Sequence, residues 1–214
     1  MRRAAGRLRA LPTTRLPALL AVLLAVLLTG LLTGCAASLD APTQPAALSG
    51  RSCPHDPGAP IRGLPQLDLP CLSGPGTVRV SSMHARVEVI NVWASWCYPC
   101  RRETRRLDAL HRQAGPDVLF LGIDVKDSAA HARAFLAHQG VGYPQATDPD
   151  GRFAHALHLF GVPSTLVVDA SGQVRWRHDG QLGPADASTL MAQVRSALSA
   201  GRLTDGGRAT PSAR

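Results

Sequence analysis

A chain of 214 residues is long enough for one domain of ordinary size with tails at both ends. The formal net charge is +8, but five basic residues and no acidic ones precede residue 18, so 18 basic and 15 acidic residues remain without that segment. That balance, with 22 arginines, one lysine and no nucleic-acid-binding motif, excludes a protein built to bind nucleic acid.

The N-terminus has the pattern of an export signal. Arginines occur up to Arg15, and residues 18–32 are almost purely apolar. The sequence LLTGC at residues 31–35 resembles the lipobox of bacterial lipoproteins, which implies cleavage before Cys35 and lipidation of that cysteine. An uncleaved anchor is the alternative, but 15 apolar residues are short against the roughly 20 that span a bilayer. We therefore expect residues 1–34 to be a signal peptide and the remaining chain to be lipid-anchored in the cell envelope, outside the cytoplasm.

Composition divides the remaining chain into three parts. Residues 35–50 are rich in Ala, Ser, Pro, Thr and Gln and predict a linker, whereas residues 201–214 predict a disordered tail. The folded domain is therefore expected over residues 51–200. Within it, Cys53 and Cys71 lie close in the sequence, and exported proteins retain disulfides, so we expect these two to be bonded. Free thiols, or bonds to another chain, are the alternatives.

Short apolar runs alternate with amphipathic segments through the domain. Residues 87–94 and 117–125 are dense in branched apolar residues and predict central parallel strands covered on both faces. Helices are expected at 99–114 and 128–139, followed by a short extended piece and a helix of about two turns before Pro163. Residues 165–180 predict a hairpin, and residues 184–198 a last helix. This order predicts an α/β fold with helices on both faces of the sheet.

The sequence NVWASWCYPCR at residues 91–101 holds two cysteines in the Cys-x-x-Cys spacing. A zinc site needs four ligands and usually offers two close pairs, which Cys53 and Cys71 do not provide. Covalent haem attachment is excluded because Arg101 stands where that motif requires histidine. A redox pair fits best, because Cys97 falls at the start of the helix, where free amides and the helix dipole favour a thiolate. No metal and no cofactor are expected.

Two motifs, WASWCYPCR at residues 93–101 and GVPST at residues 161–165, carry a family resemblance. Residues 64–198 resemble the TlpA/ResA-like thioredoxins of bacterial cell envelopes, including their central insertion at residues 143–160. The resemblance implies a thioredoxin fold, with a central mixed sheet flanked by helices, and a thiol-disulfide oxidoreductase. It also implies exported thiol or disulfide proteins as partners, apocytochrome c among them, and a membrane electron donor.

The resemblance assigns roles to individual residues. Cys97 corresponds to the attacking cysteine, Cys100 to the resolving cysteine, and Pro163 to the family's cis-proline. A cis bond at Pro163 would bring the Val162 backbone beside the cysteines, where it could pair with an extended substrate. An ordinary trans proline is the alternative. Substrate contacts are also expected from the residues around the cysteines, namely Trp96, Tyr98 and Pro99.

A buried acid is expected near the cysteine pair. Cytosolic thioredoxins bury an aspartate on the preceding strand, where this chain has Asn91, which cannot take a proton. Glu103 matches a glutamate of the ResA-like group, and we expect it to raise the thiol pKa values or to accept the proton of Cys100. A surface glutamate balancing nearby arginines is the alternative. Thr104 departs from the family by replacing its usual proline.

These observations predict an envelope thiol-disulfide oxidoreductase that acts as a reductase in cytochrome c maturation. An envelope disulfide oxidase or general redox protein would use the same residues. Copper delivery is disfavoured because such proteins space their cysteines by three residues, and a peroxiredoxin because the residues before Cys97 lack its Thr-x-x motif.

Overall fold

A computed structural model describes residues 52–54, 60, 62–83 and 85–206 of the chain. The expected signal peptide, the expected lipidation site Cys35 and the expected linker lie outside these residues, as do positions 207–214 of the expected tail. Within the described part of the chain, no helix combines the length and the apolar composition needed to cross a membrane.

A five-stranded mixed sheet forms the centre of the domain, in the order β5-β4-β3-β6-β7. Strands β4 and β5 run parallel to β3, whereas β6 is antiparallel to β3 and β7 is antiparallel to β6. The strands are β3 (Val87–Trp93), β4 (Val118–Val125), β5 (Gln145–Asp148), β6 (Ser164–Asp169) and β7 (Val174–Asp179). The expected α/β class and the parallel pairing of the two apolar strands are confirmed.

Among the described residues, four helices follow strands or loops near where the sequence predicts them: α2 (Tyr98–Ala114), α3 (Ala129–Gln139), α4 (Arg152–Ala156) and α5 (Pro184–Gly206). Helix α3 begins after Ser128, whose hydroxyl accepts from the His131 amide at 3.2 Å, and ends at Gly140 in the left-handed conformation. One predicted helix is shorter than expected, and another is longer. Helix α4 has only five residues and stops before His158, which has a positive φ, and α5 continues past Leu198 into the segment expected to be disordered.

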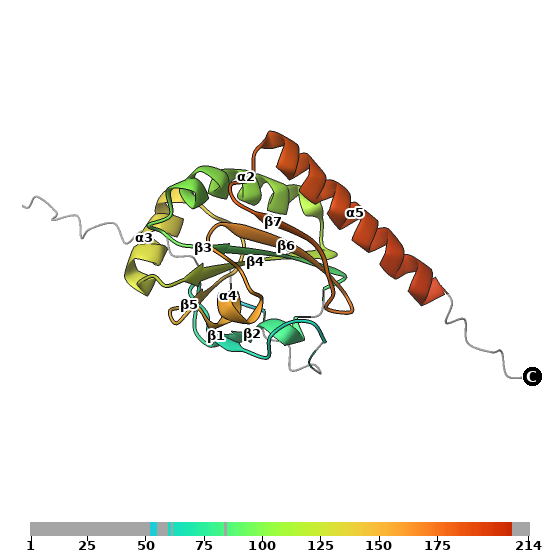
Figure 1. Ribbon diagram of the computed structural model, residues 1–214, viewed down its shortest axis with the longest axis horizontal. Coiled ribbons are helices and arrows are strands. Elements are labelled where there is room, and N and C mark those ends of the chain that lie inside the picture. Colours follow the sequence, from blue (N-terminus) through green and yellow to red (C-terminus); the bar gives the residue numbers. More distant parts are fainter. Residues whose placement is uncertain (1–51, 55–59, 61, 84, 207–214) are drawn as a thin grey trace, which may run out of the picture. The chain divides into compact units, whose positions relative to one another are not determined.

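The sheet separates two hydrophobic cores, and alternate residues of β3 serve each one. Val87, Val89 and Trp93 pack with α2, α3 and α5, whereas Ile90 and Val92 face the other core, which holds Phe153 of α4. Figure 1 shows α2 and α5 together on one side of the sheet, with α4 on the other. Since both faces of β3 are covered, its seven residues are all buried, as its apolar sequence predicts.

An N-terminal hairpin that the sequence analysis did not predict covers part of the second core. It consists of β1 (Asp68–Pro70) and β2 (Thr77–Arg79), followed by a 3-10 turn, η2 (Val80–Ser82). Leu69 and Val78 are fully buried at its centre. The Leu72 amide donates to the Gln145 carbonyl at 2.8 Å, which fastens the hairpin to β5. Strands of three residues with a proline carry almost no periodic signal, so this hairpin depends on tertiary contacts.

Cys53 and Cys71 form the disulfide that the sequence predicts. Cys71 is buried and pairs with Ala146 in an isolated antiparallel bridge, so the disulfide ties the N-terminal segment to the edge of the sheet beside β5. It lies on a different element from the Cys-x-x-Cys pair, and its position indicates a structural role.

Removing this disulfide should lower stability. We expect the Cys53→Ala/Cys71→Ala variant to lose roughly 3 kcal/mol of unfolding free energy, because a closed loop of this length restricts the unfolded chain by about that amount. Urea denaturation followed by circular dichroism measures the loss. The single Cys53→Ala variant should lose as much, and an unchanged urea midpoint in the double variant would contradict the expectation.

Candidate active site around Cys97 and Cys100

Cys97 and Cys100 form a disulfide at the N-terminus of α2. Cys97 is the N-cap residue: its backbone is extended, and its sulfur accepts from the Cys100 amide at 3.2 Å. Pro99 occupies the first turn, where the missing amide hydrogen costs no helix hydrogen bond. After reduction, a Cys97 thiolate would lie against a free amide and the positive end of the helix dipole.

The two cysteines differ in their surroundings. Cys97 is 4% exposed and is flanked by the exposed side chains of Trp96 and Tyr98, whereas Cys100 is 1% exposed and lies within the first turn of α2. A visiting disulfide therefore has its access from the side of Cys97.

The loop before Cys97 is fastened to the end of β4. Asp127 accepts from the Ser95 amide at 2.7 Å, and the Trp96 indole nitrogen donates to the Lys126 carbonyl at 3.0 Å. Lys126 has a positive φ of 50°. Trp96 is thus an exposed aromatic ring with a tethered polar end, which holds it beside Cys97 without burying it.

The Val162–Pro163 peptide bond is cis, as the family resemblance implies. Pro163 directly precedes β6, where Ser164 pairs with Val92 near the end of β3. The Cys97 loop follows the C-terminal end of β3, which lies beside the N-terminal end of β6. The Cys-x-x-Cys pair and the cis-proline loop therefore lie at the same end of the sheet. Pro163 is buried and Val162 is half-buried.

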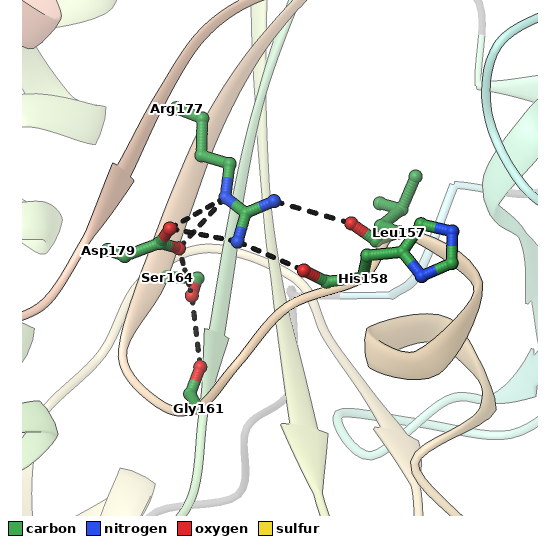
Figure 2. Close-up of polar contacts among 6 residues, drawn as sticks. All are labelled: Leu157, His158, Gly161, Ser164, Arg177 and Asp179. Carbon is green, nitrogen blue, oxygen red and sulfur yellow. Dashed lines mark hydrogen bonds and ion pairs between the residues drawn. The ribbon is translucent and has the colours of Figure 1, made fainter.

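A polar network on β7 braces the loop that leads to Pro163 (Figure 2). The Arg177 guanidinium donates to the Leu157 carbonyl at 3.4 Å and to the His158 carbonyl at 3.2 Å, and it pairs with Asp179 at 2.8 Å. The Ser164 hydroxyl lies 2.8 Å from an Asp179 carboxylate oxygen and 3.0 Å from the Gly161 carbonyl, so it has two acceptors for one proton. These contacts hold residues 157–161 against the sheet.

Glu103 is buried beneath the cysteine pair, on the inner face of α2. Its carboxylate accepts from the Leu182 amide at 2.6 Å and from the Asn91 side-chain amide at 3.1 Å. Burial raises the pKa of Glu103 to about 7, although the Leu182 and Asn91 donors and the positive charge of Arg106 act in the opposite direction. Glu103 lies three residues after Cys100, so the two share one face of the helix.

Asn91 orients this buried acid instead of replacing it. Its side-chain amide donates both to Glu103 and, at 3.1 Å, to the Thr165 hydroxyl of β6. The hydroxyl of Thr104, where the family has proline, donates to the Cys100 carbonyl at 2.7 Å. The polar groups around Cys100 thus come from β3, α2, β6 and the segment before α5.

A second buried polar contact supports the end of β3 and was not predicted from the sequence. The Trp93 indole nitrogen donates to the Gln145 side chain at 2.9 Å. Gly122 of β4 lies directly beneath that side chain, and any larger residue there would collide with it. Gly122 within an apolar strand was the only local signal, since a glycine inside a strand often marks close packing.

Other residues of the site were also missed. Leu182 contributes a backbone amide, which no side-chain pattern reveals. Arg177 and Asp179 belong to a strand whose alternation gave no hint of their contact with the cis-proline loop. Phe160, which is 95% exposed three residues before Pro163, is the most exposed of the large hydrophobic side chains in the described residues.

Comparisons with known proteins agree with this geometry. Residues 60–194 match the Redoxin family. The chain is 33% identical to the thiol:disulfide interchange protein DsbE homolog of Paracoccus denitrificans over 163 residues, which cover 75% of this chain and 83% of that protein. Among solved structures, it resembles a thiol:disulfide interchange protein of the thioredoxin family from Chlorobium tepidum, with 24% identity, a TM-score of 0.54 and coverage of 66% of this chain and 98% of that one.

A secreted thiol-disulfide isomerase from Corynebacterium glutamicum is also similar, with 25% identity and a TM-score of 0.54 over 69% of this chain and 98% of that structure. These likenesses, together with the mixed sheet, confirm the thioredoxin fold.

Substituting Glu103 should change how stability depends on pH. The folded chain keeps the Glu103 proton up to a pKa of about 7, whereas the unfolded chain loses it near 4.5. The native state therefore binds more protons within this window, so the contribution of Glu103 to unfolding free energy falls as pH rises through it. We expect the stability of the wild type relative to Glu103→Gln to decrease by roughly 3 kcal/mol between pH 4 and pH 8, both proteins being in the disulfide form.

Urea denaturation of both proteins at several pH values between about 4 and 8 measures the difference in their unfolding free energies. Glu88 and Asp124, whose pKa values burial raises to about 8, are present in both proteins and cancel in the comparison. A difference that does not vary with pH would show that Glu103 has an ordinary pKa.

Substituting Arg177 should loosen the cis-proline loop. Arg177→Ala removes the donors to the Leu157 and His158 carbonyls. Hydrogen bonds to a charged group stabilise the folded loop against local opening, so we expect amide exchange in residues 157–162 to accelerate by about tenfold. Hydrogen exchange measured by mass spectrometry reports this change. Arg152→Ala is the matched control, because the exposed Arg152 side chain makes no hydrogen bond or ion pair with the described residues. Equal exchange in both variants would contradict the bracing role.

Proposed function

Since the chain belongs to the Redoxin family and is a thiol-disulfide oxidoreductase, we propose that it reduces disulfides of exported proteins in the bacterial cell envelope, with apocytochrome c as the substrate in cytochrome c maturation. The observation that carries this proposal is the position of the Cys97 sulfur as the cap of α2 beside two exposed aromatic side chains. An isolated structural disulfide has no need of a nucleophile at a helix N-terminus.

The reaction proceeds in two exchanges. The Cys97 thiolate attacks one sulfur of the substrate disulfide, so that a mixed disulfide forms and the other substrate sulfur leaves as a thiolate. The Cys100 thiolate then attacks the Cys97 sulfur, which releases the second substrate thiolate and forms the Cys97–Cys100 disulfide. Two electrons pass to the substrate. A membrane dithiol donor returns them by the same exchanges in reverse.

Glu103 serves the second exchange. Cys100 must lose its proton to attack, and it lies in an almost fully buried position where water cannot freely accept that proton. A carboxyl group with a pKa near 7 can hold or release a proton at neutral pH, which suits a general base. The hydrogen bonds from Asn91 and Leu182 fix the carboxylate on the helix face that it shares with Cys100.

The substrate binds between the Cys97 loop and the cis-proline loop. An extended polypeptide pairs with the Val162 backbone, while Trp96 and Tyr98 offer aromatic faces on either side of Cys97. Pro99, also exposed, completes this edge. The Arg177 and Asp179 network supports this arrangement by holding the approach to Pro163 in place.

The protein acts outside the cytoplasmic membrane, tethered by lipid at Cys35. The export signal and lipobox pattern of residues 1–35 support this placement, and so does the Cys53–Cys71 disulfide, because such bonds persist in oxidising compartments. The similar protein from Corynebacterium glutamicum is described as secreted.

Trapping tests the exchange mechanism. We expect Cys100→Ser to accumulate mixed disulfides through Cys97 with envelope proteins, because the resolving thiol is gone. Non-reducing electrophoresis followed by mass spectrometry identifies the trapped proteins. Cys97→Ser is the control and should trap none, since Cys100 is inaccessible. Failure of Cys100→Ser to form any such complex would refute the mechanism.

The direction of exchange is tested by the reduction potential of the Cys97–Cys100 couple. We expect a value near or below that of thioredoxin, about −270 mV, as a reductase requires. Equilibration with glutathione or dithiothreitol buffers measures it. A value near −120 mV would establish an oxidase instead.

A further inference from the structure

One side of the active site carries a cluster of cationic and imidazole side chains, here called the basic rim. It consists of Arg101 and Arg105 of α2 and His131 and His138 of α3. All four side chains are exposed. Arg101 follows Cys100 directly, so the rim begins at the reactive disulfide and extends away from it along the two helices.

A pocket lies within the basic rim. It has a volume of about 350 Å³ and is lined by Ser95, Arg101, His131, Ala134, Phe135 and His138. Ser95 is two residues before Cys97 and belongs to the loop that holds Trp96 in place. The Phe135 ring lies beneath the Arg101 guanidinium, 6.0 Å from its carbon, which leaves the guanidinium nitrogens available at the edges. A polypeptide bound across Cys97 therefore has this pocket within reach of its neighbouring side chains.

Several arginines of the described domain are ion-paired, whereas those of the rim, like Arg152 and Arg195, have no carboxylate within ion-pair distance among the described residues. Arg79, Arg112, Arg175 and Arg177 each pair with an aspartate. By contrast, no described carboxylate lies within ion-pair distance of Arg101 or Arg105; Arg105 donates to the neutral Gln139 side chain instead.

The acidic groups nearest in the sequence are already engaged elsewhere. Glu103 faces the interior, and Asp108 pairs with Arg112. Asp127, beside the pocket, accepts from the Ser95 and Ser128 amides with its two oxygens. The rim arginines therefore have no ion-pair partner among the described residues, although the Asp127 carboxylate keeps its negative charge beside the pocket because its hydrogen bonds come from neutral amides.

We propose that the basic rim docks an acidic segment of the partner polypeptide, with aspartate or glutamate side chains a few residues from the cysteine that Cys97 attacks. The proposal rests on the proposed function and specifies the chemistry of its substrate. Each carboxylate gains an attraction that is modest in water but is summed over both arginines, and it acts chiefly by steering the encounter. Salt weakens such attraction because the charges are exposed.

Charge-matched peptides test the docking. Three synthetic peptides share one internal disulfide and differ only in a flank of three aspartates, three serines or three lysines. The reduced full chain should reduce the aspartate peptide about tenfold faster than the lysine peptide at about 20 mM salt, and the ratio should shrink at about 300 mM. Stopped-flow fluorescence measures the rates.

Charge reversal locates the effect. Arg101→Glu/Arg105→Glu should invert the preference between the aspartate and lysine peptides, and the serine peptide corrects for any change in thiolate reactivity. Arg152→Glu/Arg195→Glu, which makes the same change at exposed arginines of α4 and α5 outside the rim, should preserve the preference.

Four outcomes would overturn the proposal or its premise. Equal rates for the three peptides, or a preference that the rim variant retains, would refute the docking and leave disulfide exchange intact. A parallel loss for all three peptides in the rim variant would assign the arginines to Cys97 reactivity alone, which also refutes the docking. If the wild type reduces none of the peptides, the proposed function itself fails.

Discussion

The hydrogen bond from the Cys100 amide to the Cys97 sulfur is the contact on which the rest of the site depends. It makes a cysteine the cap of α2, which places a reactive atom where the helix leaves amides free and its dipole is positive. That position is possible because β3, buried on both faces, ends directly below the loop. The second cysteine then follows one turn along, with its sulfur hidden from solvent. Both cysteines are buried, and the proposed difference in their roles rests on the exposed side chains of Trp96 and Tyr98, which flank Cys97.

Burial of Glu103 disfavours its ionisation and brings its pKa close to neutral pH. A carboxyl group removed from water resists ionisation, and three donors or charges around Glu103 offset only part of that penalty, so its pKa stays near 7. The sheet supplies Asn91 and, through it, Thr165, while the segment before α5 supplies the Leu182 amide. The acid therefore links α2 to β3, β6 and the start of the last helix. A group whose protonation changes near neutral pH is thereby placed on the same helix face as the buried thiol.

The two sides of the disulfide are built differently. On the side of the cis-proline, Arg177 pairs with Asp179 and donates hydrogen bonds to the Leu157 and His158 carbonyls. The charged side chain there restricts the motion of the loop before Pro163. On the side of α3, the arginines of the basic rim have no carboxylate partner among the described residues, so they remain available to bind an acidic segment of a substrate polypeptide. A rigid backbone edge on one side and free charge on the other suit a polypeptide substrate that pairs through its main chain and is selected through its side chains.

The sequence alone determined the α/β class, the central strands, the helices after them and the redox pair, because each has a strong local signal: dense branched residues, a capped amphipathic run, or a short motif. The cis-proline and the buried glutamate were expected only from the family resemblance, which left a trans proline and a surface glutamate as alternatives. It did not determine the hairpin of β1 and β2, the length of α4 or the C-terminal end of α5. Nor did it determine the contacts of Gln145, Leu182, Arg177 and Asp179. Those were decided by the tertiary structure. Three-residue strands have too few residues to show a period, and backbone amides such as that of Leu182 acquire a role only when the folded chain brings a buried carboxylate to them.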